Sequence, residues 1–327
     1  MTAFKACLLR LIALACAAGA PLAHAAGPEG FPNRPVRIVV PFPPGGSNDI
    51  VGRVFGQRLA ERWGQPVVID NRGGAGGSIG SELAARSQPN GYTLLIGAVS
   101  TMAANVSLYK LGFDPLKDLV PLAKVASGAF VLVTHAGLPV NSARELIALA
   151  RARPGALNYG SSGGGSSLHL VAELFRNKAG VDIVHVPYKG GGPAVTDLVA
   201  GQIAILFTDM APVGGHVKAG RLKALAQTTA KRTAPLSDLP TLNESALPGY
   251  VAEAWYGFLA PAGVPAPLVR FLNAELNAVA TSPEMQARLV GLGIESATST
   301  PEEFRALIRA EIAKWAEVVR VSGARVD

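Results

Sequence analysis

The residues best suited to chemistry stand in the loop 41–49, which reads Pro-Phe-Pro-Pro-Gly-Gly-Ser-Asn-Asp. The loop follows an apolar run at 37–40 and precedes apolar residues at helical spacing from Ile50 onward, so it joins a strand to a helix. Gly45 and Gly46 let the backbone approach a ligand closely, and Asp49 can cap the helix and organise its loop. Free N–H groups at the helix start, with the helix dipole behind them, favour a carboxylate or phosphate. The sequence therefore predicts an anion site, and an ordinary turn is the alternative.

Two later loops repeat this arrangement of strand, small polar residues and helix. The loop 160–167, Gly-Ser-Ser-Gly-Gly-Gly-Ser-Ser, follows a short strand at 156–159. It offers hydroxyl donors at Ser161 and Ser166 and backbone donors at Gly163 and Gly164. His169 falls in the first turn of the next helix, and Ser100 lies in the loop after another strand, at 92–97. Several loops thus place hydrogen-bonding groups at the carboxyl ends of strands.

Catalysis is the alternative to ligand binding as the function of these loops. Gly160-x-Ser162-x-Gly164 matches the nucleophile elbow of serine hydrolases. A loop of four glycines and four serines satisfies that pattern almost by accident, and no downstream acid and histidine are arranged as a base with its orienting partner. The sequence also contains no G-x-x-x-x-G-K-[ST] and no H-E-x-x-H motif. We therefore expect binding without turnover, with no metal and no cofactor.

The first 25 residues have the pattern of an export signal. Lys5 and Arg10 form a basic start, residues 11–20 are apolar, and Ala23-His24-Ala25 is a small-x-small cleavage site. We expect cleavage after Ala25 and a periplasmic protein. Both cysteines lie in this leader, so the exported chain has no thiol for a disulfide or a thiolate metal site. A lipid anchor at Cys16 is the second alternative, because the residues before it match a lipobox poorly.

The charge of the exported chain suits acidic small molecules. The net charge of +7 includes two basic residues of the leader, which holds no acidic residue, so 7 − 2 = +5 remains. The basic residues are scattered, without a Lys/Arg run or interleaved aromatic residues. We therefore do not expect nucleic acid to bind. A mildly basic, solvated surface is the simpler explanation of this charge.

The rest of the chain supplies the elements that position these loops. Apolar, β-branched runs alternate with helical stretches, which predicts an α/β fold with mostly parallel sheets flanked by helices. Capping boxes are expected at 142–145 and 300–303. Three helices close the chain, at 265–280, 283–292 and 301–321.

Two apolar, strand-like runs at 120–125 and 130–134 are separated only by residues 126–129, and we interpret them as a crossover between two lobes. The chain is expected to return to the first lobe through 254–259. We assign residues 1–25 to the signal peptide, 26–127 plus 254–327 to lobe 1, and 128–253 to lobe 2.

The order of these motifs also resembles a known family, the Bug-type solute-binding proteins of tripartite tricarboxylate transporters. The similarity covers essentially the whole exported chain and is carried by residues 34–46 (RPVRIVVPFPPGG), 71–80, 90–95, 157–161, 166–175 and 185–190. The family implies a two-lobed periplasmic receptor that closes on a small carboxylate and delivers it to a membrane permease. In this chain the departures at Pro43, where many relatives have Ala, and at Gly164-Gly165 bear on which acid fits.

The resemblance also implies the ligand contacts. They are the loop 42–49, including Phe42 and Pro44, the loop 161–167 with His169, and the region of Lys189, Gly190 and Asp209. We expect a monomer that binds a di- or tricarboxylate, an acidic amino acid or an aromatic acid by hinge closure. The alternatives are a hydrolase that uses Ser162 and a ligand-sensing module for a signalling partner.

Overall fold

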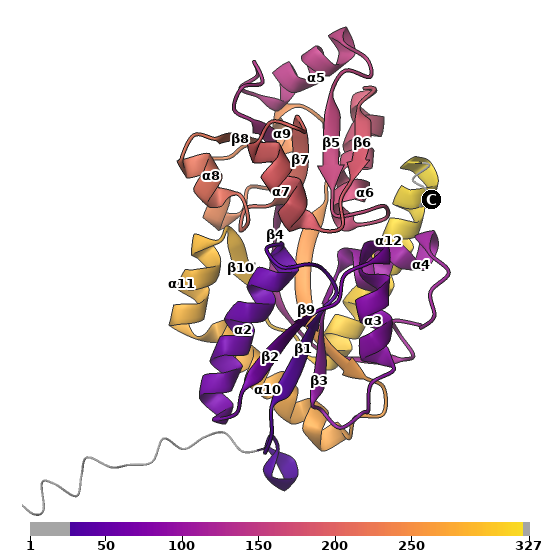
Figure 1. Cartoon of the computed structure of the whole chain (residues 1–327), viewed down its shortest axis with the longest axis vertical. Helices are drawn as coiled ribbons and strands as arrows, with labels where there is room; N and C mark the ends of the chain where they lie inside the picture. The colour runs from indigo at the N-terminus through magenta and orange to yellow at the C-terminus, as the bar shows by residue number, and fades with distance from the viewer. Residues whose placement is uncertain (1–26, 323–327) are drawn as a thin grey trace, which may run out of the picture.

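The protein has two lobes stacked along its long axis (Figure 1). The computed structural model describes residues 27–322, and the expected signal peptide lies outside them. Ten strands of this part form one continuous, mixed sheet in the order β2-β1-β3-β9-β4-β7-β5-β6, with β8 and β10 also paired to β4. The strands are β1 (Val36–Val40), β2 (Val67–Asn71), β3 (Thr93–Ala98), β4 (Leu119–His135), β5 (Asn158–Ser161), β6 (Val184–Pro187), β7 (Ile205–Asp209), β8 (Leu222–Gln227), β9 (Glu253–Pro261) and β10 (Ile294–Ser296). The predicted two-lobed α/β fold is confirmed.

Each lobe has three parallel strands, as the alternation of strand and helix predicts. In the lower lobe β1 pairs in parallel with β2 and β3, and in the upper lobe β5 pairs in parallel with β6 and β7. Antiparallel strands extend both sets, because β9 joins β3 to β4 and β4 continues to β7 and β8. The carboxyl ends of the parallel strands in the two lobes therefore face the gap between the lobes.

Strand β4 connects the lobes without a break. Residues 126–129, which the sequence analysis places between two strands, pair with β9, and residues 126–128 also pair with β10. The expected gap was wrong because the four small residues look like a loop in sequence, whereas strand partners from distant segments hold them extended. Beyond this point the same strand pairs with β7 and β8 in the upper lobe.

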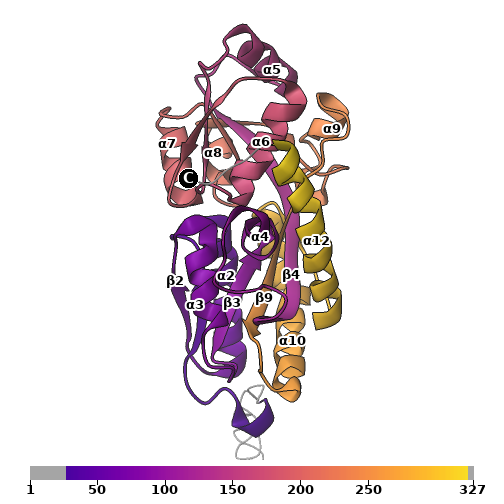
Figure 2. The ribbon, with the colours of Figure 1, turned by 90° about the vertical axis from the view of Figure 1, so that its right-hand side faces the viewer.

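Helices cover both faces of the sheet (Figure 2). They are α2 (Ser47–Trp63), α3 (Ser78–Ala85), α4 (Asn105–Leu108), α5 (Ala143–Ala152), α6 (Ser167–Ala179), α7 (Gly191–Val199), α8 (Gly214–Lys218), α9 (Leu242–Ser245), α10 (Ala266–Thr281), α11 (Pro283–Gly291) and α12 (Pro301–Ser322). The 3-10 turns are η2 (Pro28–Gly30), η3 (Ala75–Gly77) and η5 (Ala234–Leu236), and η4 (Ser100–Ala104) is a π-helical segment. The three closing helices occur where they were predicted. Helix α12 runs beside β4 and reaches α6 of the upper lobe.

The two expected capping boxes differ in outcome. At the start of α12 the Glu303 N–H donates to Thr300 Oγ1 at 3.1 Å, and the Thr300 N–H donates to the Glu303 carboxylate at 2.9 Å. At α5 the Glu145 N–H donates to Ser142 Oγ, but the Glu145 carboxylate accepts from the N–H of Asn141 instead of Ser142. The second box is therefore half formed.

A buried carboxylate ties α2 to α10. Glu275 accepts two hydrogen bonds from the Arg62 guanidinium, at 2.8 and 2.9 Å, and a third from Trp63 Nε1 at 3.0 Å. The Glu275 side chain is 9% exposed and that of Arg62 is 40% exposed. Because Arg62 can still reach water, removal of the charge should cost less than the 3–5 kcal/mol typical of breaking a fully buried pair.

We expect Glu275→Gln to lower the free energy of unfolding by about 1–3 kcal/mol, since the amide cannot accept all three donors. Chemical denaturation of the two proteins measures this difference. The matched control is Glu317→Gln, which removes the carboxylate of the exposed pair with Arg320 and should leave the transition unchanged. Equal midpoints for Glu275→Gln and the wild type would contradict the role given to this contact.

Candidate functional site

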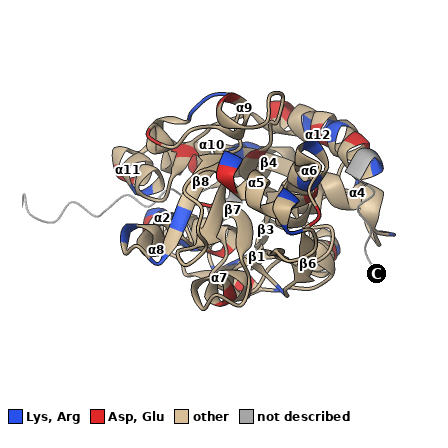
Figure 3. Ribbon diagram, turned by 90° about the horizontal axis from the view of Figure 1, so that it is seen from above, with Lys and Arg blue, Asp and Glu red and all other residues tan. Residues whose placement is uncertain are grey.

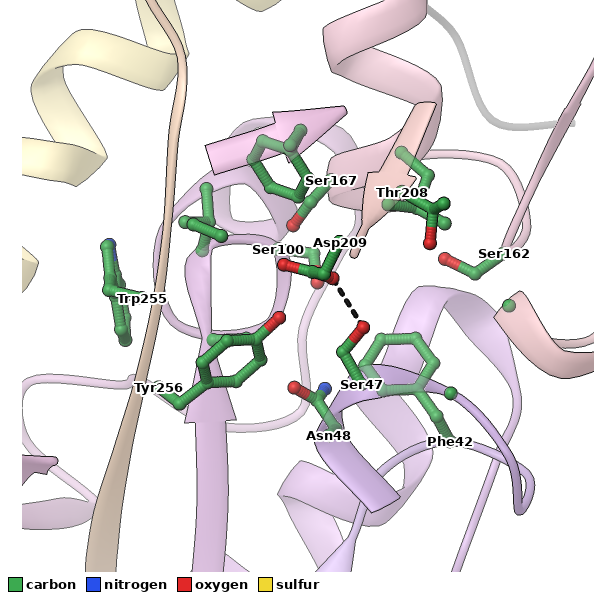
Figure 4. Close-up of a pocket in the computed structure, with 17 residues that line it drawn as sticks. Phe42, Ser47, Asn48, Ser100, Ser162, Ser167, Thr208, Asp209, Trp255 and Tyr256 are labelled. Atoms are coloured by element: carbon green, nitrogen blue, oxygen red, sulfur yellow. Dashed lines mark hydrogen bonds between the residues drawn. The ribbon is translucent and has the colours of Figure 1, made fainter. Parts of the chain in front are cut away.

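A cavity of about 60 Å³ lies between the two lobes. Residues from both lobes and from the strands that connect them line it: Phe42, Gly46, Ser47, Asn48, Ala98, Val99, Ser100, Phe130, Ser162, Ser167, Leu168, Gly191, Thr208, Asp209, Ala254, Trp255 and Tyr256. Figure 4 shows the oxygen atoms of Ser47, Asp209 and Tyr256 directed towards one another. Aromatic and aliphatic side chains form much of the wall, so the cavity combines an apolar surface with a few polar groups, as small-molecule sites do.

Helix α2 begins at the cavity wall. Its N-cap is Gly46, in an extended conformation, and no side chain caps the helix there. Asp49 lies in the first turn, where its carboxylate accepts hydrogen bonds from the Gly45 N–H, from Asn71 and from Arg53, each at 3.0 Å. Burial alone would raise the pKa of Asp49, but these hydrogen bonds outweigh burial and hold the pKa below its ordinary value. An ionised Asp49 thus fixes the loop 41–49.

The second glycine-rich loop, residues 160–167, contacts a stack of aromatic rings formed by Tyr159, His169 and His185. His169 and His185 lie with ring centroids 4.1 Å apart, and the Tyr159 ring lies 5.0 Å from His185 and 6.4 Å from His169. His185 Nε2 is 2.7 Å from Ser161 Oγ, and His169 Nδ1 accepts from the Gly165 N–H at 3.1 Å. Burial lowers the pKa of both histidines, that of His185 to about 4, where the neighbouring His169 adds to the effect. Both rings are therefore neutral at pH 7.

This stack predicts a loss of stability in mild acid. In the unfolded chain His185 takes up a proton near its ordinary pKa of about 6.5, whereas in the folded protein it does so only at about pH 4. Between these values the unfolded state binds more protons, so the free energy of unfolding falls as the pH falls, by about 2 kcal/mol from pH 7 to pH 4.5.

Denaturation with urea at a series of pH values checks this. His185→Gln should flatten the profile between pH 6.5 and 4.5, because it removes the group that titrates. The control is His135→Gln, which replaces a histidine outside the stack and should keep the wild-type slope. An unchanged slope in His185→Gln would show that other groups cause the acid sensitivity.

Asp209 lies at the centre of the cavity, at the end of β7, and is 4% exposed. Its Oδ2 accepts a hydrogen bond of 2.5 Å from Ser47 Oγ, which belongs to the other lobe. The Tyr256 hydroxyl faces the same carboxyl group and favours its ionised form. Burial is nevertheless the larger influence and raises the pKa of Asp209. The second oxygen, Oδ1, is buried and has no hydrogen-bond partner in the described structure.

The lobes touch at several glycines around the cavity. The Tyr109 hydroxyl of the lower lobe donates a hydrogen bond of 2.5 Å to the Gly164 carbonyl of the upper lobe. At Gly192 an added Cβ would stand 2.8 Å from the Pro44 carbonyl oxygen, and at Gly190 it would stand 2.7 Å from the ring of Pro43. These close approaches leave no room for side chains at Gly190 and Gly192, so the two lobes contact one another around the cavity.

The structure places only some of the predicted site residues at the cavity. Phe42, Gly46, Ser100 and Asp209 line the cavity. Pro44 and Gly45 line a shallower outer groove, while Lys189 is exposed and Gly190 is the N-cap of α7. Asp49 lies in the first turn of α2 and does not line the cavity. The other five build the second loop and the start of α6 behind the wall: Ser161, Gly163, Gly164, Ser166 and His169.

Several lining residues were missed in the sequence. Trp255 and Tyr256 stand on β9, where the chain crosses back to the lower lobe, and Phe130 stands on β4 beside them. Their aromatic side chains signal only a core strand, because nothing local shows that this strand borders the cavity. Ser47 was not among the predicted contacts, although its hydroxyl donates a hydrogen bond to Asp209 of the other lobe.

The geometry does not assemble a hydrolase. Ser162 lines the cavity, but His185 bonds to its neighbour Ser161, which is fully buried.

Residues 27–322 contain no group of three or more His, Cys, Asp or Glu side chains that could hold a metal ion. No helix in the same range is long and apolar enough to cross a membrane. Basic and acidic residues are interspersed along the outer helices (Figure 3).

Comparison with known proteins identifies the family of this chain. Residues 51–323 match the tripartite tricarboxylate transporter family receptor. Protein BugT of Bordetella pertussis is 39% identical over 300 residues, which span 91% of this chain and 92% of BugT. A solved structure of an R. palustris protein with adipate has a TM-score of 0.88 at 38% identity, and covers 91% of this chain and all of that one. MatC from Rhodopseudomonas palustris with bound malate has a TM-score of 0.84 at 32% identity, over 88% of this chain and all of MatC. The chain therefore belongs to the family of tripartite tricarboxylate transporter receptors.

Proposed function

We propose that the protein captures a small carboxylate between its lobes and delivers it to the membrane subunits of a tripartite transporter. The family consists of periplasmic binding receptors and not of enzymes, and two structural neighbours were solved with the dicarboxylates adipate and malate. The two lobes of this chain surround a cavity of about 60 Å³, which suits a compact molecule.

One observation carries the proposal, namely that three helices from the two lobes begin at this cavity. The first turns of α2, α6 and α7 contribute Ser47, Ser167 and Gly191 to its wall. First-turn N–H groups have no partner within their own helix, and the helix dipole adds about half a positive charge at each start. A carboxylate is the ligand group that such ends stabilise.

Hinge closure follows from the same arrangement. We propose that residues 26–127 plus 254–327 rotate as lobe 1 against 128–253 as lobe 2, about the two segments that cross near Phe130 and Ala254. Here β4 pairs with β9, and the Thr228 N–H donates to the Phe130 carbonyl at 3.0 Å. A ligand bound by helix starts of both lobes stabilises the closed form, because only that form brings both sets of donors to it.

Isothermal titration against mono-, di- and tricarboxylates, amino acids and aromatic acids tests the proposal. We expect saturable binding of one class of acid, and the bound ligand should also raise the midpoint of thermal unfolding. Small-angle scattering should show a more compact particle with ligand than without it. Failure of every acid to bind would refute a carboxylate receptor, and binding without compaction would refute closure.

A further inference from the structure

A hydrogen bond joins the two lobes outside the cavity. The Tyr109 hydroxyl of lobe 1 donates to the Gly164 carbonyl of lobe 2 at 2.5 Å, and neither residue lines the cavity. The bond from Ser47 to Asp209 also crosses between the lobes, but it lies in the cavity wall. The Tyr109 contact can therefore bear on how the lobes hold together without touching a ligand in the cavity.

Lobe 1 holds the tyrosine in place. Tyr109 directly follows α4, at the end of lobe 1 that faces α6 of lobe 2 (Figure 2). Its N–H donates to the Asn105 carbonyl at 2.9 Å. The fully buried Asn105 side chain donates in turn to the Gly76 carbonyl at 3.0 Å and to Ser78 Oγ at 3.1 Å. An added Cβ at Gly76 would stand 3.1 Å from both the Tyr109 hydroxyl oxygen and the Gly164 carbonyl oxygen. The backbone of Gly76 thus packs against the bond, and a side chain there would crowd it.

The second glycine-rich loop holds the acceptor in place. Gly163 and Gly165, on either side of Gly164, have φ of +118° and +71°, a region that favours glycine. The Gly163 N–H donates to Ser161 Oγ at 3.1 Å. The Gly165 N–H donates to His169 Nδ1, also at 3.1 Å. Because the carbonyl lies between two anchored residues, formation of the bond does not have to order a loose loop.

The bond can exist only while the lobes lie against one another. In the hinge opening proposed above, Tyr109 and Gly164 separate, and water can bond to both groups. The bond therefore stabilises the closed form alone. A ligand enters the open form before the bond has formed, but it leaves only after the bond has broken. The expected effect is on dissociation and not on association, as for most changes at an interface.

We propose that Tyr109 is a latch residue, which sets how long the closed receptor retains its ligand through the hydrogen bond to the Gly164 carbonyl. This inference rests on the proposed function and deepens it, because it assigns ligand retention to a residue that does not line the cavity. Loss of a neutral hydrogen bond changes an equilibrium constant by about three- to tenfold. The same factor should appear in the dissociation rate constant of the ligand.

Stopped-flow fluorescence with the best acid of the panel measures both rate constants, since Trp255 lines the cavity. We expect Tyr109→Phe to raise the dissociation rate constant by about three- to tenfold and to keep the association rate constant within about twofold of the wild type. The matched control is Tyr92→Phe, which removes a hydroxyl that donates to Asn33 of the same lobe. The control should leave both rate constants unchanged.

The outcomes separate the latch from the proposed function. A wild-type dissociation rate constant in Tyr109→Phe, with an acid still bound, would overturn the latch and leave a carboxylate receptor. A change in the association rate constant alone would also overturn it, because the hydroxyl would then act in the open form. If no acid of the panel binds to the wild type, the proposed function fails and the latch fails with it.

Discussion

Replacement of Gly46 by valine should weaken ligand binding by about 100-fold, because overpacking a fitted site costs up to about 3 kcal/mol. A Cβ at Gly46 would lie 3.9 Å from the Gly191 nitrogen of the other lobe, which is ordinary contact. The two further methyl groups of valine would extend into the cavity or against the backbone of α7, and the cavity holds only about 60 Å³. Calorimetric titration with the best acid of the panel measures the loss.

The fold should survive this substitution. Gly46 has φ −86° and ψ 169°, an extended conformation that β-branched residues adopt readily. The matched control is Gly215→Val on α8, where an added Cβ meets nothing within 4 Å, and this variant should bind like the wild type. Retained affinity in Gly46→Val would show that the ligand does not lie against the start of α2.

The parallel core of each lobe could be predicted because its signals are local. The apolar run at 37–40, the glycine turn and the helical spacing after Ile50 specify one strand–loop–helix unit without help from distant residues. Strand β1 (Val36–Val40) follows this prediction within one residue, and helix α2 (Ser47–Trp63) begins three residues before Ile50. The same holds for β5 and α6 around the second loop.

The parts that escaped prediction depend on contacts between distant residues. Residues 126–129 are extended only because β9 and β10 pair with them, and neither strand adjoins them in sequence. The cross-lobe bond from Ser47 to Asp209 spans 162 positions, so no local pattern could indicate it. The loops themselves were recognised from their glycines, but which residues of each loop face the cavity depends on how the two lobes pack against one another.

Closure can be tested at a residue outside the cavity. Gly192 lies in the first turn of α7, and an added Cβ would stand 2.8 Å from the Pro44 carbonyl oxygen of the opposite lobe. Backbone atoms yield less easily than a flexible side chain, so Gly192→Ala should disfavour the closed form. We expect the affinity for the best acid to fall by about tenfold or more, because the apparent dissociation constant rises as the binding-competent population shrinks.

The same substitution should leave the free protein as stable as before, or more so, since alanine in a helix is favoured over glycine by roughly 0.5–1 kcal/mol. Gly215→Ala on α8 is the matched control, because it brings the same gain in helix propensity without a neighbour within 4 Å. Scattering should show that saturating ligand compacts the control but compacts Gly192→Ala less. Wild-type affinity and full compaction in Gly192→Ala would mean that the bound form is more open than the arrangement described, and that the glycine contacts between the lobes do not limit closure.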